Sequence, residues 1–431
     1  MHRQLELAPT YVVQLDGKIL VNAYAVGDVD GDGATELLFG TLMGKVSIFK
    51  IIGDRLSLWR SCEVNGSVTS MSLDNSFAED IRIVVATAEG KCFVFRSVAG
   101  VKVLQLCSEF VRNMYIDKSG IVMGDVINVM LLFKNAALNV CDVVHVNKEV
   151  IVATRDGRVF IYSDHANFDE LAEYTQIAKL EINGEIEALI VLPATSDTPT
   201  RVLARCFSGA VFSIAGPNNE GVRNVGPWNG PKADNDSVTF VVNDIELGGK
   251  RGMNALVSLN GLVSLFSSSG QKLWEIQLSE PVVNADKLEM SATSGERHDA
   301  IVVCTWSGQM YAIQSEKRLV QFRMLLPGCS MFCANIQDSS GHIDPTIVSI
   351  STSGTVFVYR DVQNTLVQGF EDSTLADQVK ESAVFAQIDT PVKRIEVMNK
   401  LHKTFPHLQL ANSSDAPGVN ELIKIMLAVQ L

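Results

Sequence analysis

The chain has 431 residues, of which 47% are hydrophobic and 20% are charged, enough to bury a large core. Its formal net charge of −13 argues against a nucleic-acid partner, because phosphate binding requires clustered Lys and Arg side chains. The eight cysteines show no paired framework, the amino terminus lacks an apolar signal segment, and no run of about 18 apolar residues could span a bilayer. We therefore expect a soluble protein of a reducing compartment, without a transmembrane segment.

The first predicted elements are two strands joined by an acidic, glycine-rich turn within Val26–Gly40. Asp28, Asp30 and Asp32 alternate in this turn, and Glu36 begins the second strand. Carboxylates gathered in one tight turn repel one another unless a cation offsets their charge, and a hard cation with oxygen ligands, such as calcium, is the usual solution. The alternative is a turn without metal, held by hydrogen bonds between Asp side chains and the backbone.

The second half of this unit recurs along the chain. Each copy has a β-branched run, a glycine and a strand of alternating apolar and polar residues, and the copies follow one another at intervals of roughly 50 residues. The repeated glycines are Gly44, Gly90, Gly157, Gly209, Gly261, Gly308 and Gly354. This spacing predicts an all-β fold, a seven-bladed β-propeller, with glycine supplying positive φ in the middle turn. The alternative is seven unrelated hairpins in a β-sandwich.

In chain order, blade one is predicted over Ala23–Val64 and blade two over Ser67–Phe110. The longer interval that follows predicts an insertion at Val111–Lys134, which we interpret as a hairpin. Blades three and four are expected to begin at Leu138 and Ile186.

Three Gly-Pro pairs within Gly216–Asp236 predict an exposed loop, with Trp228 near its tip. No outer strand follows the last repeat, so Thr10–Leu15 is expected to close the ring and remove its exposed edge. The propeller is thus predicted over residues 1–361. Apolar residues three to four apart predict a helical segment over residues 362–431, which either packs on the propeller rim or binds a partner.

The sequence does not support catalysis. Its seven histidines form no metal-binding spacing such as His-Glu-x-x-His, and no Gly-x-Ser-x-Gly motif is present. Cys329 and Cys333 occupy alternate positions of a predicted strand, which favours core thiols over a zinc pair. We expect a protein that is not an enzyme.

The acidic turn resembles the calcium loop of FG-GAP repeats, the blades of integrin-alpha-type propellers. The resemblance implies that Asp28, Asp30 and Asp32 each provide a carboxylate oxygen, Ala34 a backbone carbonyl and Glu36 the closing carboxylate. The closing residue of the repeat is normally Asp, so Glu36 departs from the pattern by one methylene. A bound Ca²⁺ would stiffen the hairpin and take no part in catalysis.

Three further segments, Leu273–Leu278, Val302–Tyr311 and Arg318–Arg323, resemble the integrin-alpha FG-GAP repeat-containing protein 2 family. The resemblance covers roughly Tyr11 to Arg360 and implies a subunit of KICSTOR, which holds the GATOR GTPase-activating complex at the lysosomal surface. That assembly restrains the TOR growth kinase when nutrients are short. A kaptin-like propeller and other KICSTOR subunits are the implied partners, and the implied location is cytoplasmic and peripheral at the lysosomal membrane. The alternative function is a calcium-dependent adhesion or glycan-binding FG-GAP propeller.

Overall fold

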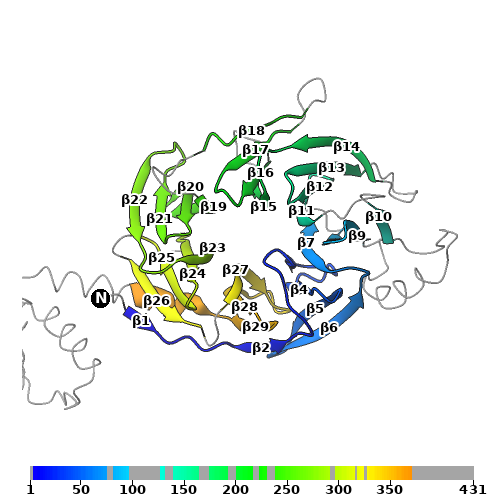
Figure 1. Cartoon of the computed structure of the whole chain (residues 1–431). Coiled ribbons are helices and arrows are strands. Elements are labelled where there is room, and N and C mark those ends of the chain that lie inside the picture. Colours follow the sequence, from blue (N-terminus) through cyan, green and yellow to red (C-terminus); the bar gives the residue numbers. More distant parts are fainter. Residues whose placement is uncertain are drawn as a thin grey trace, which may run out of the picture.

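The computed structural model describes residues 3–74, 81–96, 127–131, 139–164, 174–192, 200–216, 223–230, 238–291, 297–315, 318–324 and 328–370. Seven sheets surround a central opening, as Figure 1 shows. The predicted all-β, seven-bladed β-propeller is therefore confirmed. Within each sheet the strands follow one another from the centre to the rim.

The first four blades take their strands in chain order. Blade one contains β3 (Tyr24–Gly27), β4 (Glu36–Gly40), β5 (Lys45–Ile52) and β6 (Arg55–Glu63). Blade two contains β7 (Val68–Asp74), β8 (Arg82–Thr87), β9 (Lys91–Arg96) and β10 (Ile127–Leu131). Blade three contains β11 (Val140–Val146), β12 (Glu149–Thr154), β13 (Arg158–Asp164) and β14 (Tyr174–Glu181). Blade four contains β15 (Ile186–Leu192), β16 (Arg201–Cys206), β17 (Val211–Ile214) and β18 (Val225–Pro227).

Blade five again takes its strands in chain order, whereas blades six and seven also use strands from the amino terminus. Blade five contains β19 (Val238–Leu247), β20 (Lys250–Ser258), β21 (Leu262–Phe266) and β22 (Lys272–Gln277). Blade six contains β23 (Val282–Leu288), β24 (Ala300–Thr305), β25 (Gln309–Ile313), β26 (Leu319–Arg323) and, at its edge, β1 (Arg3–Leu5). Blade seven contains β27 (Gly328–Gln337), β28 (Ile343–Ser351), β29 (Thr355–Tyr359) and, as its outer strand, β2 (Tyr11–Gln14).

The repeated glycines have the conformation that the repeat predicts. All seven have φ between 79° and 91° in the turn between the second and third strands of their blades. At Gly44, a Cβ atom would lie 2.4 Å from the carbonyl oxygen of Val64, in the connection to the next blade. Both the left-handed backbone and this close approach require glycine.

Neighbouring blades pack face to face, so the middle strands are buried on both sides. All positions of β4, β8, β24 and β29 are buried, which explains their continuous apolar sequences. Blade one meets blade seven through aromatic rings: Tyr24 stacks on Phe332 with ring centroids 4.0 Å apart, and Phe39 lies 6.4 Å from the same ring.

The amino-terminal residues join two blades. β2 pairs antiparallel with β29, from Tyr11 opposite Val358 to Gln14 opposite Thr355. β1 pairs parallel with β26, from Arg3 opposite Val320 to Leu5 opposite Phe322. The sequence analysis did not foresee β1, because a three-residue strand carries too short a pattern to detect.

Blade two differs from its predicted limits. Its outer strand, β10, pairs antiparallel with β9 and comes from the segment interpreted as an inserted hairpin. The predicted end of this blade at Phe110 was therefore wrong. Pairing along a blade edge depends on which strand reaches it, and the chain spacing alone does not reveal that.

Trp228 is also placed differently from the prediction. Its side chain is half-buried and packs against Val241, Leu256 and Phe266 of blade five. The segment predicted as an exposed loop supplies β18, the outer strand of blade four. Its remaining residues at 217–222 and 231–236 lie outside the described residues.

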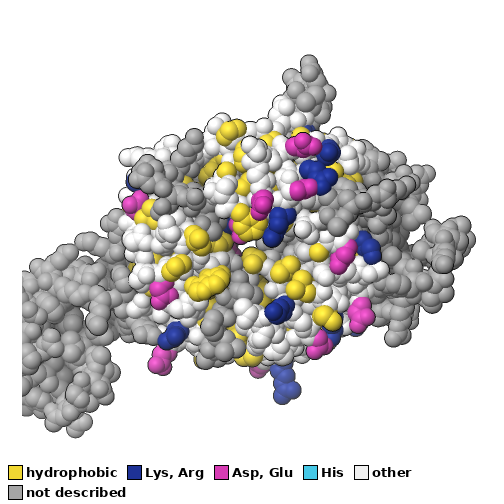
Figure 2. Space-filling model, viewed as in Figure 1, with side chains coloured by type: hydrophobic (Ala, Val, Ile, Leu, Met, Phe, Trp, Pro, Cys, Tyr) yellow, Lys and Arg dark blue, Asp and Glu magenta, His cyan; other side chains and the backbone are white. Residues whose placement is uncertain are grey.

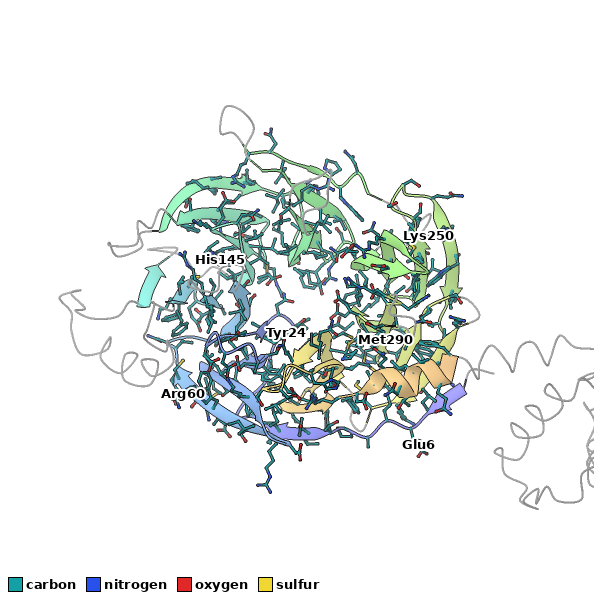
Figure 3. The ribbon with its side chains drawn as sticks, turned by 180° about the vertical axis from the view of Figure 1, so that it is seen from behind. Glu6, Tyr24, Arg60, His145, Lys250 and Met290 are labelled. Carbon is teal, nitrogen blue, oxygen red and sulfur yellow. The ribbon has the colours of Figure 1, made fainter. Side chains whose placement is uncertain are left out.

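A helix over residues 362–370 follows the last strand and lies against blades six and seven, seen from behind in Figure 3. Val362, Leu366 and Phe370 repeat every four residues and are buried in the core of these blades. The side-chain amide of Gln363 donates to the carbonyl oxygen of Ser291 at 2.7 Å. The side-chain oxygen of Gln363 accepts the backbone N–H of Ser291 at 3.1 Å. The rest of the predicted helical segment, residues 371–431, lies outside the described residues, so the proposed domain boundary stays a prediction.

Candidate functional site

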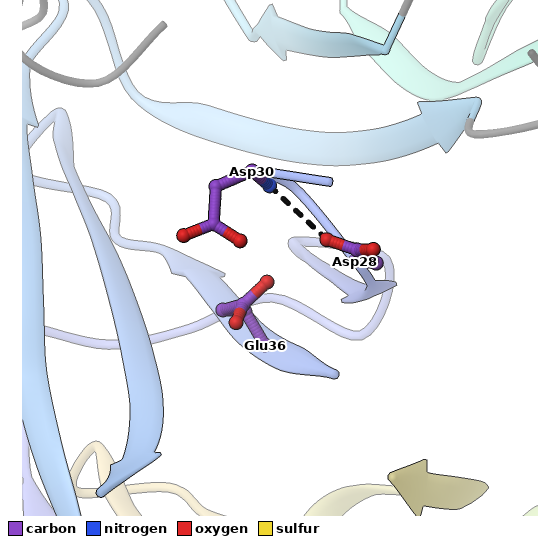
Figure 4. A group of neighbouring side chains, drawn as sticks. All are labelled: Asp28, Asp30 and Glu36. Carbon is purple, nitrogen blue, oxygen red and sulfur yellow. Dashed lines mark hydrogen bonds between the residues drawn. The ribbon is translucent and has the colours of Figure 1, made fainter. Parts of the chain in front are cut away.

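The acidic turn connects β3 to β4, and Figure 4 shows three of its carboxylates close together. Oxygen atoms of Asp28, Asp30 and Glu36 lie within 4.8 Å of one another, a grouping compatible with a metal ion. Asp28, however, already accepts three backbone N–H groups, from Asp30 at 3.2 Å, Gly31 at 2.7 Å and Gly33 at 2.8 Å. Its side chain therefore caps the turn, as in the Asx turn considered from the sequence.

Lys50 of β5 directs its ammonium group into this cluster. The Nζ atom lies 3.1 Å from Asp30 Oδ2 and 3.1 Å from Glu36 Oε1, and it also donates to Asp32 Oδ2. The remaining oxygens of Asp32 and Glu36 accept the backbone N–H groups of Ala34 and Val29, both at 2.9 Å. The side-chain charge of Lys50 thus lies between three of the four carboxylates.

The sequence analysis did not identify Lys50, although the hairpin contains a signal for it. Leu37 pairs with Phe49 across β4 and β5, so the next residues outward, Glu36 and Lys50, are cross-strand neighbours. Counting outward from the turn at Gly44 would have found this pair, because the turn sets the hairpin register.

Burial and charge together set the protonation of the cluster. Burial raises the pKa of Glu36 to about 7, despite the opposing effects of the Val29 N–H and Lys50. Burial would lower the pKa of Lys50, but its contacts with Asp32, Asp30 and Glu36 together raise that pKa above its usual value. The pKa of Asp32 is lowered, since contacts with Lys50 and the Ala34 N–H outweigh the effect of burial. Lys50 therefore remains a permanent cation at neutral pH.

The sequence predicts a calcium site formed by Asp28, Asp30, Asp32, Ala34 and Glu36. The contacts of Lys50 lie within this predicted site. A calcium ion coordinated by the same carboxylates would have to displace the Lys50 ammonium from Asp30 and Glu36. The residues as arranged do not fit the ion while Lys50 lies among them. Calcium binding by the native chain stays a prediction.

A second set of carboxylates links the innermost strands. Asp142 of β11 accepts from Ser70 Oγ of β7 at 2.5 Å and from the Leu189 N–H of β15 at 2.7 Å. Asp286 of β23 accepts from the Cys333 N–H of β27 at 2.7 Å. Each joins its blade to a neighbour. Tyr24, whose pKa is raised by burial and by the charges of Asp286 and Asp142, lies close to the same central opening (Figure 3).

Asp142 predicts a distinct pH dependence of stability. Burial raises the pKa of Asp142 from 3.8 to about 6. Between these two pH values, the folded chain keeps a proton on Asp142 that the unfolded chain releases. The stabilisation is complete below the unfolded pKa and is lost as pH rises through about 6. Between pH 4 and pH 7, the free energy of unfolding of the native chain should fall by about 2–3 kcal/mol relative to Asp142→Asn. Denaturant unfolding of both proteins at several pH values measures this difference.

The control is Asp16→Asn, because the side chain of Asp16 is 85% exposed and pairs with Lys45 at the surface. Its pH profile should run nearly parallel to that of the native chain. Equal profiles for native protein and Asp142→Asn would mean that Asp142 titrates alike in the folded and unfolded states.

Four of the large hydrophobic side chains that are exposed lie beside turns of the propeller. Met43, Phe207, Leu259 and Trp306, which we call the turn-face patch, precede the turn glycines of blades one, four, five and six. Their exposed fractions are 78%, 50%, 56% and 75%. Turns between second and third strands all lie on the same face of a propeller. Figure 2 shows one face of the molecule, on which hydrophobic side chains gather around the central opening. Large apolar side chains left in water on one face are candidates for an interaction surface.

Among the described residues, Cys92, Cys141, Cys206 and Cys333 are free thiols. Burial raises the pKa of Cys333 well above its usual value, and the charge of Asp286 adds to this effect, so the thiol is poorly suited to act as a nucleophile or metal ligand. The side chain of Cys329 lies outside the described residues. No helix within the described part of the chain is long and apolar enough to cross a membrane.

Residues 230–364 match the family model of integrin-alpha FG-GAP repeat-containing protein 2. KICSTOR complex protein ITFG2 of Bos taurus is 23% identical over 400 residues, covering 84% of this chain and 72% of the relative. The Mus musculus protein of the same name is 22% identical over 412 residues, covering 84% of this chain and 86% of the relative. The resemblance inferred from the sequence motifs is confirmed.

The fold is also similar to a chain in the crystal structure of BBS1N in complex with ARL6DN, soaked with mercury. The TM-score is 0.55 and the identity 14%, covering 83% of this chain and 97% of that chain. The same complex soaked with lead gives a TM-score of 0.53 and 15% identity, with the same coverage. At this identity the similarity concerns the fold alone.

Proposed function

We propose that this chain is a non-catalytic scaffold propeller of a KICSTOR-type assembly. The observation that carries the proposal is the similarity to two proteins named KICSTOR complex protein ITFG2, which extends over 84% of the chain. An alignment of this extent spans most of the propeller and is not limited to one repeated motif.

The geometry supports a scaffold role. The buried carboxylates around the centre accept hydrogen bonds from neighbouring blades, as Asp142 and Asp286 do, so they hold the ring together. The turn-face patch, in contrast, leaves large apolar side chains in water, which costs roughly 25 cal/mol per Å² of apolar surface. A partner that covers the patch would recover this free energy.

The partner in this proposal is a kaptin-like propeller, with further KICSTOR subunits in the same assembly. The chain would then be cytoplasmic and peripheral at the lysosomal membrane. Its role would be to help hold the GATOR GTPase-activating complex there and to restrain TOR kinase signalling when nutrients are low. Support for these finer points comes from the family resemblance.

The experiment is affinity purification of the full chain from cells, with mass spectrometry of the co-purified proteins. A kaptin-like propeller and other KICSTOR subunits should be enriched together. If these subunits are absent from native preparations, the proposed function is wrong.

The turn-face patch is tested with the double variant Met43→Ser and Trp306→Ser. Co-expression with the kaptin-like chain and size-exclusion chromatography should show at least tenfold weaker association. The matched control is Ile52→Ser with Leu58→Ser, two side chains that are similarly exposed but lie away from these turns. Full association of the patch variant would show that the interface lies elsewhere on the propeller.

The alternative, a calcium-dependent adhesion or glycan-binding propeller, depends on the acidic turn binding metal. The Lys50 ammonium within that turn weighs against it. Calcium-dependent binding of cells or glycans by the purified chain would favour this alternative over the scaffold.

A further inference from the structure

We propose that Lys50 replaces the calcium ion of the FG-GAP loop with a cation built into the chain. The acidic turn would then be folded and charge-compensated without metal. Lys50→Met would convert the same turn into a binding site for divalent and trivalent hard cations. This inference does not depend on the proposed scaffold function.

The position of the ammonium group is the first argument. Lys50 Nζ is 3.1 Å from Asp30 Oδ2 and 3.1 Å from Glu36 Oε1, and it donates to Asp32 Oδ2. These are three of the four carboxylates to which the family resemblance gives the calcium ion. An ammonium and a metal ion cannot both lie among them.

Burial is the second argument. The side chains of Asp30, Glu36 and Lys50 are 6%, 0% and 12% exposed, so water contributes little to compensating their charges. A buried carboxylate needs a cation or hydrogen-bond donors. Glu36 Oε1 is buried without an aligned hydrogen-bond donor, and the Lys50 ammonium is its nearby positive charge.

The covalent attachment of Lys50 is the third argument. The side chain extends from β5, opposite the start of β4, and its Nζ lies 5.2 Å from the centre of the Trp59 ring on β6. The strand pairing and this cation–π contact hold the ammonium in place before any ion arrives. A free metal ion must therefore compete with the Lys50 ammonium, which the fold already holds beside the carboxylates.

Terbium provides a direct probe, because it binds at calcium sites and an indole nearby sensitises its luminescence. The full-length native chain should show no sensitised emission and no shift in melting temperature between millimolar calcium and chelator. Lys50→Met should gain sensitised emission that calcium displaces, together with a melting temperature that rises with calcium. Asp30→Asn added to Lys50→Met should reduce the gained emission at least tenfold.

Lys45→Met is the matched control, since Lys45 lies on the same strand but pairs with the exposed Asp16 at 2.9 Å. It should gain no terbium emission. Calcium-dependent melting of the native chain, abolished by Asp30→Asn with Asp32→Asn, would overturn the proposal, because the ion would then displace Lys50.

Three further outcomes of Lys50→Met are decisive. A variant that folds only when calcium is present supports the replacement of ion by side chain. A variant that is folded by circular dichroism but gains no cation binding, or that stays unfolded in calcium, overturns it. None of these outcomes bears on co-purification of the native chain with partner subunits, so failure here leaves the proposed function intact.

Discussion

A chain that lacks its first 16 residues is expected to aggregate or to melt far below the full-length protein. The deletion removes β2, which covers the edge of β29, and β1, which covers the edge of β26. It also removes Leu15, which is buried, and Leu5 and Leu7, which pack against the core of blades six and seven. At about 1.5–3 kcal/mol for each fully buried side chain, the loss is on the order of 5 kcal/mol, a large part of the stability of a typical domain.

Thermal unfolding and size-exclusion chromatography measure this effect. Two point variants separate loss of packing from loss of length. Leu15→Ser should lower the melting temperature by several degrees, whereas Val12→Ser, on a side chain that is 55% exposed, should melt close to the native protein. A soluble deletion variant with native melting would show that the amino-terminal strands contribute little to closing the ring.

Removal of residues 362–431 is also expected to unfold the propeller, whereas removal of residues 371–431 should leave it folded. Val362, Leu366 and Phe370 are 2%, 0% and 2% exposed and belong to the core of blades six and seven. Their loss exposes the apolar side chains that they cover and costs about 5–8 kcal/mol as an upper estimate. The helix at 362–370 thus packs into the core of blades six and seven, and a test of partner binding by the tail must begin after Phe370.

Circular dichroism melts of the two truncated chains check this expectation. Within the full-length chain, Leu366→Ala should cost about 2–4 kcal/mol. Gln368→Ala, two residues further on and on the exposed side of the helix, should cost little. Native melting of the chain truncated before Val362 would contradict the buried role of the helix. If the chain truncated after Phe370 loses its partner, the tail is the partner-binding segment that was considered from the sequence.

The acidic turn shows how local and long-range features combine. The alternation of Asp28, Asp30 and Asp32 made the cluster visible in the sequence, and the turn at Gly44 implied the register that places Lys50 opposite Glu36. Both features lie within one hairpin, where sequence separation is short. The family pattern concerns only the metal ligands within the turn, and so it does not indicate the cation on the neighbouring strand.

Two segments that the sequence predicts as an exposed loop and an inserted hairpin are partly used within the propeller. Trp228 packs on blade five, and β10 completes blade two. The turn-face patch is a candidate that only the structure reveals, because its exposed residues come from four blades that lie far apart in the sequence.

The sequence by itself determined the repeat, the number of blades and the conformation of the seven turn glycines. These follow from local rules: alternating side chains, a left-handed turn residue and the span of four strands. Only the tertiary structure decided that β1 joins blade six, that Asp142 connects three blades and that the helix at 362–370 completes the core. Each of these depends on segments distant in the chain meeting across a packed interface. A local sequence pattern does not predict these contacts, because the free energy that stabilises them comes from burying both segments together.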